Sequence, residues 1–187
     1  MEFIGFSQTR QWYFEGAFLS QMPSGGTQLR WEGGGSIGNW ADPAYVGWTT
    51  SALNGAWCTT GSGNPDRIVM NISGPTSTDV NQWHNDTLAA VQNARRLYPG
   101  IRTVYLQPVV GGPGHTTCTF NGVTVRASFN EPYISQAISR LVSEGVGVWG
   151  ANPLVHSCAD YADDIGHLTP TGYGNAAVDV GAFYHGR

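Results

Sequence analysis

A carboxylate and an imidazole stand close together near the C-terminal end of the sequence. Asp164 precedes His167 by three residues on a short stretch that contains a glycine. On a turn, this spacing lets the carboxylate bind the imidazole Nδ1 and leaves Nε2 facing outward, which is how a histidine general base is oriented. Asp163, one residue earlier, is the alternative orienting carboxylate. A solvated histidine beside a surface aspartate is the simpler interpretation, so the surrounding sequence has to decide.

The residues after this pair predict that a helix begins at once. The Thr169 hydroxyl can cap the first turn, and Pro170 suits the first helical position because it has no backbone N–H to leave unpaired. We expect this last helix to run from about Pro170 to Tyr184. The Asp–His pair would then be held at a helix entrance.

A serine at the other end of the sequence can supply a nucleophile. Residues 2–6 form a short apolar run that predicts a strand, and residues 9–21 have roughly helical spacing of apolar residues. Ser7 lies at the junction, where its hydroxyl can project from the carboxyl edge of a sheet, the place at which open α/β folds bind ligands. The alternative role for Ser7 is a simple helix N-cap.

A glycine-rich stretch follows a second predicted strand at 27–31. Four glycines occur in the six residues from Gly33 to Gly38. Glycine lets backbone N–H groups turn toward a bound oxygen, which suits an oxyanion site. A phosphate-binding loop would need a G-K-[ST] ending, and the sequence has no lysine. A plain flexible loop is the other alternative.

The remaining pattern predicts an α/β fold with a five-stranded parallel sheet between two helical layers. Strands are expected at 67–73, 101–108 and 146–149, with a minor strand at 124–129, and helices at 79–98 and from Glu131 to Gly145, the second capped by Asn130. Residues 42–57 are either helical or irregular. Strands and helices that alternate at this spacing give a three-layer α/β/α arrangement joined by right-handed crossovers.

Length, charge and cysteine content limit the classes of function that this protein can have. A chain of 187 residues fits a single domain spanning 1–187, and no apolar run approaches the 18 residues of a membrane span. A net charge of −4 with nine scattered arginines disfavours nucleic-acid binding. Of three cysteines, Cys118 and Cys158 can form a bridge between two loops, although three inert thiols are equally compatible. No secretory signal is recognisable, so localisation stays open.

In its order of motifs the sequence resembles the SGNH, or GDSL-type, hydrolase family over nearly its whole length. The specific part is the segment from Asp164 to Tyr173, which is similar to the family ending D-x-x-H-L-T-P-x-G-Y. The resemblance implies a flavodoxin-like SGNH-hydrolase fold, with Ser7 as nucleophile, His167 as general base and Asp164 as its orienting carboxylate. The Gly38 N–H would be an oxyanion donor together with that of Ser7.

Two motifs depart from the family. The family's G-D-S is here Gly5-Phe6-Ser7, and its G-x-N-D is replaced by the segment 74–77, so the amide that should help to hold the oxyanion is missing. Losing one such donor typically lowers turnover by about 10²–10³. Thr76 is the substitute we favour; Ser77, Asn71 and Asn39 are the alternatives.

The combined prediction is a serine ester hydrolase that needs no metal or organic cofactor. Its substrate would be a small ester or an acylated carbohydrate, because Trp40, Trp48 and Trp57 near the glycine loop can stack on a sugar face. The alternative is that these tryptophans belong to the hydrophobic core, which is the more common role of such residues. The competing function is a non-catalytic module that keeps the fold and binds glycan or a partner protein. Oligomeric state is not predicted.

Overall fold

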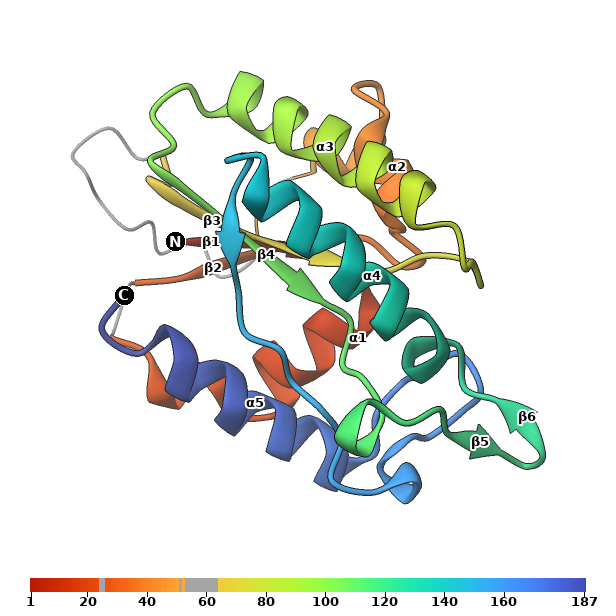
Figure 1. Ribbon diagram of the computed structural model, residues 1–187. Helices are drawn as coiled ribbons and strands as arrows, with labels where there is room; N and C mark the ends of the chain where they lie inside the picture. Colours follow the sequence, from red (N-terminus) through yellow and green to blue (C-terminus); the bar gives the residue numbers. More distant parts are fainter. Residues whose placement is uncertain (24–25, 51, 53–63) are drawn as a thin grey trace.

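The computed structural model describes residues 1–23, 26–50, 52 and 64–187 (Figure 1). Five parallel strands form its main sheet, in the order β2-β1-β3-β4-β7. Their bounds are Glu2–Gly5 (β1), Gln28–Trp31 (β2), Arg67–Ile72 (β3), Thr103–Pro108 (β4) and Val148–Trp149 (β7). The α/β class and the five-stranded parallel sheet predicted from the sequence are confirmed.

Helices cover both faces of this sheet, consistent with a three-layer α/β/α fold (Figure 1). On one face lie α2 (Ile37–Ala41), α3 (Val80–Leu97) and α4 (Arg126–Ser143). On the other lie α1 (Ser7–Arg10), its π-helical continuation η1 (Gln11–Glu15), the 3-10 turn η2 (Phe18–Gln21) and α5 (Pro170–Tyr184). The first and last helical segments of the chain therefore pack together, α5 against η1 and η2.

Aromatic side chains fill the layer between the sheet and α5. Phe3 of β1 makes edge-to-face contacts with Trp12, Phe18 and Tyr184 at centroid distances of 5.6, 5.1 and 5.3 Å. All four side chains are at most 1% exposed. Such pairs stabilise beyond the area that they bury. They fix the start of the chain against its last helix, which is what brings Ser7 and the His167 loop to one edge.

The strand order reverses direction at β1. β1 pairs with β2 on one side and with β3 on the other, and the chain crosses the sheet on opposite faces at this point. Open α/β sheets bind ligands in the crevice outside the carboxyl ends of the strands where such a reversal occurs. Ser7 lies two residues after the end of β1, and Ser73 directly follows β3, so both lie at this crevice.

The expected helix at 9–21 begins earlier and is interrupted. It starts at Ser7 and breaks at Gly16 and Ala17, where Ala17 has a left-handed φ of 60°. A side chain at Gly16 would come within 2.3 Å of the Tyr173 carbonyl oxygen, so α5 packs directly on the backbone there. The helix therefore ends at a glycine where α5 makes this close approach.

Helix α2 lies inside the stretch that was expected to be only a glycine loop. Ser36 caps it, with its Oγ accepting a hydrogen bond from the Asn39 N–H at 3.3 Å. A helix of five residues is too short for apolar periodicity to be recognised. The glycines preceding it form the turn that leads from β2 into the cap.

The start of α4 was predicted wrongly. The helix begins at Arg126, so the minor strand expected at 124–129 is reduced to Val123–Thr124 (β6), paired with Thr119–Phe120 (β5) in a hairpin. Asn130 is not a cap. Its side chain lies within the helix and binds the carbonyl oxygens of Gly74 and Pro75 at 3.2 and 3.0 Å, so it fixes the loop after β3.

Short 3-10 turns complete the described chain, at Val46–Trp48 (η3), Pro113–His115 (η4) and Cys158–Asp160 (η5). A disulfide joins Cys118 to Cys158, which confirms the bridge considered from the sequence. It ties the segment before α4 to the loop that precedes His167. Trp57 and Cys58 lie outside the described residues, as does most of the 42–57 segment beyond η3.

Candidate active site

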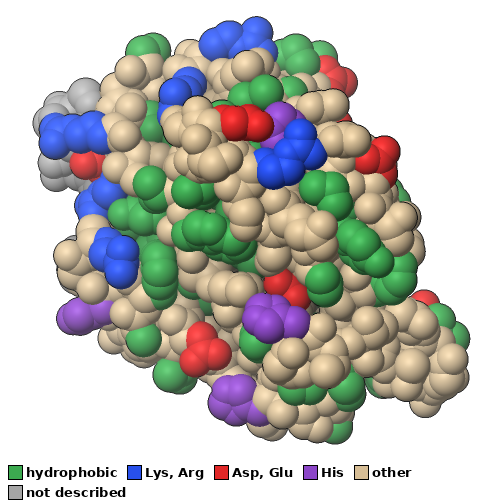
Figure 2. Space-filling view, in the orientation of Figure 1, with side chains coloured by type: hydrophobic (Ala, Val, Ile, Leu, Met, Phe, Trp, Pro, Cys, Tyr) green, Lys and Arg blue, Asp and Glu red, His purple; other side chains and the backbone are tan. Residues whose placement is uncertain are grey.

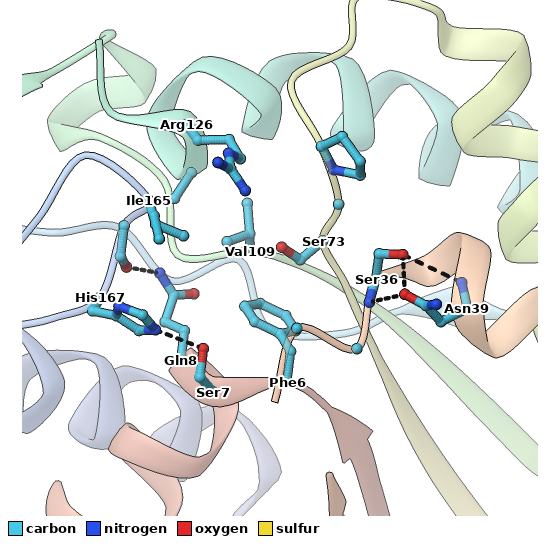
Figure 3. Close-up of a pocket in the computed structure, with 16 residues that line it drawn as sticks. Phe6, Ser7, Gln8, Ser36, Asn39, Ser73, Val109, Arg126, Ile165 and His167 are labelled. Atoms are coloured by element: carbon cyan, nitrogen blue, oxygen red, sulfur yellow. Dashed lines mark hydrogen bonds between the residues drawn. The ribbon is translucent and has the colours of Figure 1, made fainter. Parts of the chain in front are cut away.

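Ser7 and His167 come together at the carboxyl edge of the sheet, as the sequence predicted (Figure 3). The Ser7 Oγ lies 2.8 Å from the His167 Nε2, although 160 residues separate them. Ser7 is the first residue of α1, and His167 stands three residues before the start of α5. The distance is that of a hydrogen bond between a nucleophile and its base.

The carboxylate that orients His167 is Asp163, not Asp164. The His167 Nδ1 lies 2.5 Å from the Asp163 Oδ2, while the Asp164 side chain is exposed and only its carbonyl oxygen is engaged, by the Arg126 N–H at 2.8 Å. The reason is the local turn. The Asp163 Oδ1 accepts the N–H groups of residues 165, 166 and 167 at 3.0, 2.9 and 3.0 Å, which folds the chain back over the carboxylate.

This arrangement sets the ionisation of Asp163. Partial burial raises the pKa of its carboxyl, but the hydrogen bonds from the His167 side chain and from the backbone of His167 and Gly166 outweigh it, so the net pKa is lowered. The group is therefore an anion at neutral pH. Since an ionised carboxylate can only accept hydrogen bonds, the His167 Nδ1 must carry a proton. The other ring nitrogen, Nε2, is the one that faces Ser7.

Two glycines allow the backbone of this site to close. A Cβ on Gly5 would come within 2.3 Å of the Thr9 Oγ1, so no larger residue fits where β1 turns into α1. Gly166 has a φ of +109°, and a Cβ there would lie 2.3 Å from the Ala127 Cβ. The first glycine lets the helix start directly behind the strand, and the second lets the His167 loop pack on the start of α4.

Two glutamines on the Ser7 side hold the backbone on either side of His167. Gln8 donates from its Nε2 to the Gly166 carbonyl oxygen at 2.7 Å, and its Oε1 accepts the Val110 N–H at 2.9 Å. Gln11 binds Leu168 twice, accepting its N–H at 3.0 Å and donating to its carbonyl oxygen at 3.3 Å. The nucleophile and the base are thus fixed to one another by the backbone as well as by their own contact.

A cavity of about 240 Å³ opens beside the Ser7–His167 pair. Both polar and apolar residues line it. Its lining consists of Phe6, Ser7, Gln8, Gly34, Gly35, Ser36, Asn39, Ser73, Gly74, Pro75, Val109, Arg126, Ala127, Ile165, Gly166 and His167. Phe6, which stands where the resembled family has aspartate, forms part of this wall.

Neither of the two predicted oxyanion residues beyond Ser7 lines this cavity. Gly38 is the second residue of α2 and faces Asp86 of α3, whose Oδ2 would lie 3.4 Å from a Cβ at that position. Thr76 is exposed and is not among the residues that line the cavity. Asn130 has drawn the 74–77 segment toward α4, as its bonds to Gly74 and Pro75 show.

Among the alternatives to Thr76, only Asn39 lines the cavity. Asn71 is committed elsewhere, because its amide donates to the Ile4 carbonyl oxygen at 3.1 Å. The Ser77 hydroxyl lies outside the lining and contacts Gln82. Asn39 lies across the cavity from Ser7, where its Oδ1 accepts from the Ser36 N–H (Figure 3).

Ser73 and Arg126 are lining residues that the sequence did not single out. Figure 3 shows the Ser73 hydroxyl turned toward the interior, and the Arg126 guanidinium reaching in from the start of α4. Ser73 could have been found, because it directly follows a buried strand and so falls at the carboxyl edge. Arg126 gave no signal, since the start of α4 was misplaced by five residues.

The described tryptophans near the glycine loop belong to the core. Trp40 and Trp48 are 0% and 8% exposed and pack edge to face at 4.9 Å. The Trp48 Nε1 donates to the carbonyl oxygens of Trp40 and Asp42 at 3.2 and 3.1 Å. Neither ring faces the cavity, so the stacking platform considered for a sugar is not formed by these two residues.

No family model matches this chain, and no curated protein or solved structure shows significant similarity to it. Within the described ranges, no three or more His, Cys, Asp or Glu side chains are grouped so that they could hold a metal ion. None of the helices described has the length and apolar character needed to cross a membrane. What supports a function is therefore the site geometry and the motif resemblance.

Proposed function

We propose that this protein is a serine ester hydrolase of the SGNH type, with Ser7 as nucleophile, His167 as general base and Asp163 as the carboxylate that orients His167. The observation that carries the proposal is the continuous chain of contacts, 2.8 Å from Ser7 to His167 and 2.5 Å from His167 to Asp163. Three groups of these types in this order form the arrangement of a catalytic triad.

The reaction would proceed in two halves. The His167 Nε2 takes the proton of the Ser7 hydroxyl as the oxygen attacks the acyl carbonyl carbon, and the tetrahedral intermediate then expels the alcohol, which receives that proton from His167. An acyl group remains on Ser7. In the second half His167 deprotonates a water molecule, which attacks the acyl carbonyl, and the proton returns to Ser7 as the carboxylic acid leaves.

The negative charge that develops on the carbonyl oxygen in the tetrahedral intermediate has to be stabilised by hydrogen-bond donors that are already in place. The Ser7 N–H is suited, because it is the first N–H of α1 and has no acceptor within the helix. We assign the second donor to the Ser73 hydroxyl in place of the missing amide, on the ground that it turns into the cavity (Figure 3). A hydroxyl can rotate to follow the developing oxyanion.

The cavity volume favours small substrates. At about 240 Å³ it falls below the usual range for pockets that enclose a drug-sized ligand. A short acyl group such as acetyl therefore fits better than a long chain. The prediction of a carbohydrate as the alcohol portion was based on the tryptophans near the glycine loop, and the buried Trp40 and Trp48 give it no support.

Hydrolysis of 4-nitrophenyl acetate tests the proposal. Ser7→Ala should lower kcat by about 10⁴-fold or more, because it removes the nucleophile, while the melting temperature changes little. Ser143→Ala, on the exposed end of α4, is the matched control and should retain full activity. Full activity in Ser7→Ala would refute the assignment. An inactive wild type with a well-folded site would favour the competing function, a non-catalytic binding module.

A further inference from the structure

Arg126 is the only residue with a permanent charge among those that line the cavity. No aspartate or glutamate lines it with Arg126. The guanidinium is half-buried and forms no ion pair or hydrogen bond with any residue that the structure describes. A permanent positive charge therefore stands unpaired in the wall of the proposed active site.

This state is unusual among the arginines of the chain. Seven of the nine have a side-chain partner, which is a carboxylate, a carbonyl oxygen, an amide or an aromatic ring. Among the described residues, Arg126 and Arg102 have no such partner, and Arg102 is exposed to solvent just before β4, at the opposite edge of the sheet. Solvent screens Arg102, whereas Arg126 lies where a bound ligand would replace the water around it.

The position of Arg126 relative to His167 indicates which part of an ester would meet it. The Arg126 N–H binds the Asp164 carbonyl oxygen at 2.8 Å, and Ala127 packs against Gly166, so the start of α4 rests on the His167 loop. His167 must deliver a proton to the departing alcohol oxygen. The alcohol portion of the ester therefore lies on the same side of the cavity as Arg126.

The opposite side of the cavity is uncharged. Gly35, Ser36 and Asn39 form it, and the Ser36 and Asn39 side chains bind one another across 2.6 Å (Figure 3). A short acyl group would meet no charge there. Figure 2 shows arginine, acidic and histidine side chains distributed among uncharged surface on one face of the molecule.

We propose that the cavity selects esters whose alcohol portion carries a carboxylate, which Arg126 binds with its guanidinium. The inference rests on the proposed esterase function and adds the substrate class to it. Guanidinium groups bind carboxylates through two parallel charge-assisted hydrogen bonds, about twice as strong as neutral ones. The reaction is the acyl transfer described above, and Arg126 takes part in binding only.

Two matched pairs of synthetic esters test this. 4-Acetoxybenzoate and 4-acetoxybenzamide differ in a carboxylate on the alcohol portion, and mono-4-nitrophenyl glutarate and 4-nitrophenyl butyrate differ in one on the acyl portion. In the variant Arg126→Gln, kcat/KM for 4-acetoxybenzoate should fall about tenfold or more, while the values for the other three esters change less than threefold. Comparing the variant with the wild type cancels differences in intrinsic reactivity between esters.

Control variants separate this effect from general charge. Arg102→Gln removes the other unpaired arginine and should leave all four esters unchanged. Asp164→Asn removes the acidic side chain of the residue whose carbonyl oxygen accepts the Arg126 N–H, and it should not lower 4-acetoxybenzoate hydrolysis. A loss that is equal for 4-acetoxybenzoate and 4-acetoxybenzamide in Arg126→Gln, or one confined to the glutarate ester, would overturn the inference while leaving the esterase function intact.

A binding measurement makes the test independent of turnover. In protein carrying Ser7→Ala, calorimetric titration with 4-acetoxybenzoate should show binding that weakens about tenfold when Arg126→Gln is added. If the wild type hydrolyses none of the four esters but this difference persists, the esterase function fails and the carboxylate site stands. If binding is unchanged by Arg126→Gln, the carboxylate site is refuted whatever the activity.

Discussion

Replacing Asp163 by asparagine should disable the site through the tautomer of His167, not through loss of shape. In the wild type the Asp163 Oδ1 accepts three backbone N–H groups, and the Oδ2 accepts from the His167 Nδ1. An asparagine oxygen must keep the position of Oδ1, because an NH₂ group there would face three donors. Its NH₂ group is then forced to face Nδ1.

The consequence for His167 follows from its two nitrogens. With an NH₂ donor opposite, Nδ1 must act as acceptor, so the neutral ring carries its proton on Nε2. That nitrogen can no longer take the Ser7 proton. The same substitution in a Ser-His-Asp triad lowers kcat by about 10⁴ for this reason, and we expect a loss of the same order here.

Asp164→Asn is the matched control, because it makes the same chemical change on the adjacent residue. The Asp164 side chain is exposed, so we expect kcat/KM within threefold of the wild type. The assay is 4-nitrophenyl acetate hydrolysis at neutral pH. The reasoning fails if Asp164→Asn is the damaging variant, or if both variants keep activity within tenfold of the wild type.

Asp163→Asn should also have a pH-dependent effect on stability. Because hydrogen bonds lower the folded-state pKa of Asp163 below its unfolded value, its stabilising contribution is present above about pH 4 and is lost as the pH falls further. Urea unfolding should therefore show the variant less stable than the wild type at pH 7, with the difference shrinking toward pH 3. A pH-independent difference would contradict this cause.

Three further outcomes are expected. Gln8→Leu should lower the free energy of unfolding by about 3 kcal/mol, because it leaves two buried backbone groups unsatisfied, and should lower kcat by about tenfold; urea unfolding and ester hydrolysis measure the two. Replacing Cys118 and Cys158 by serine should lower the free energy of unfolding by up to about 4 kcal/mol, the chain-entropy value for the 40-residue separation, and a loss below 1 kcal/mol would argue against that account. Finally, kcat/KM should fall as acid protonates the His167 Nε2, and a flat acidic profile would exclude a histidine base.

The convergence of Ser7 and His167 could be predicted because it depends on topology. Each residue lies beside a recognisable signal: Ser7 follows the end of an apolar strand, and His167 precedes a Thr-Pro helix start. In a parallel sheet these signals place both residues at the same edge. Local pattern and global fold agree here, and the prediction needed no detail of side-chain geometry.

The orienting carboxylate could not be chosen with the same certainty from spacing. Asp163 and Asp164 are adjacent, and either is close enough in the sequence for its carboxylate to reach the His167 side chain. What selects Asp163 is the turn in which its Oδ1 caps three successive N–H groups. That turn includes Gly166, which has a left-handed φ of +109° and where a Cβ would lie 2.3 Å from the Ala127 Cβ of α4.

The oxyanion side of the site was predicted less well for a related reason. Gly38 and Thr76 were chosen by alignment to motifs, but their positions are set by contacts between elements. A short helix places Gly38 against α3, and Asn130 holds the segment that contains Thr76 against α4. Neither contact produces a periodic pattern of residues that could be recognised in the sequence.

Covalent labelling of the nucleophile tests the central claim most directly. A fluorophosphonate reagent reacts with a serine only when a neighbouring base activates it. We predict one adduct per chain by intact mass, located on Ser7 by peptide mapping, absent in Ser7→Ala and formed much more slowly in Asp163→Asn than in Asp164→Asn. No adduct on the folded wild type, or an adduct on a different residue, would contradict the assignment of Ser7, His167 and Asp163 as a catalytic triad.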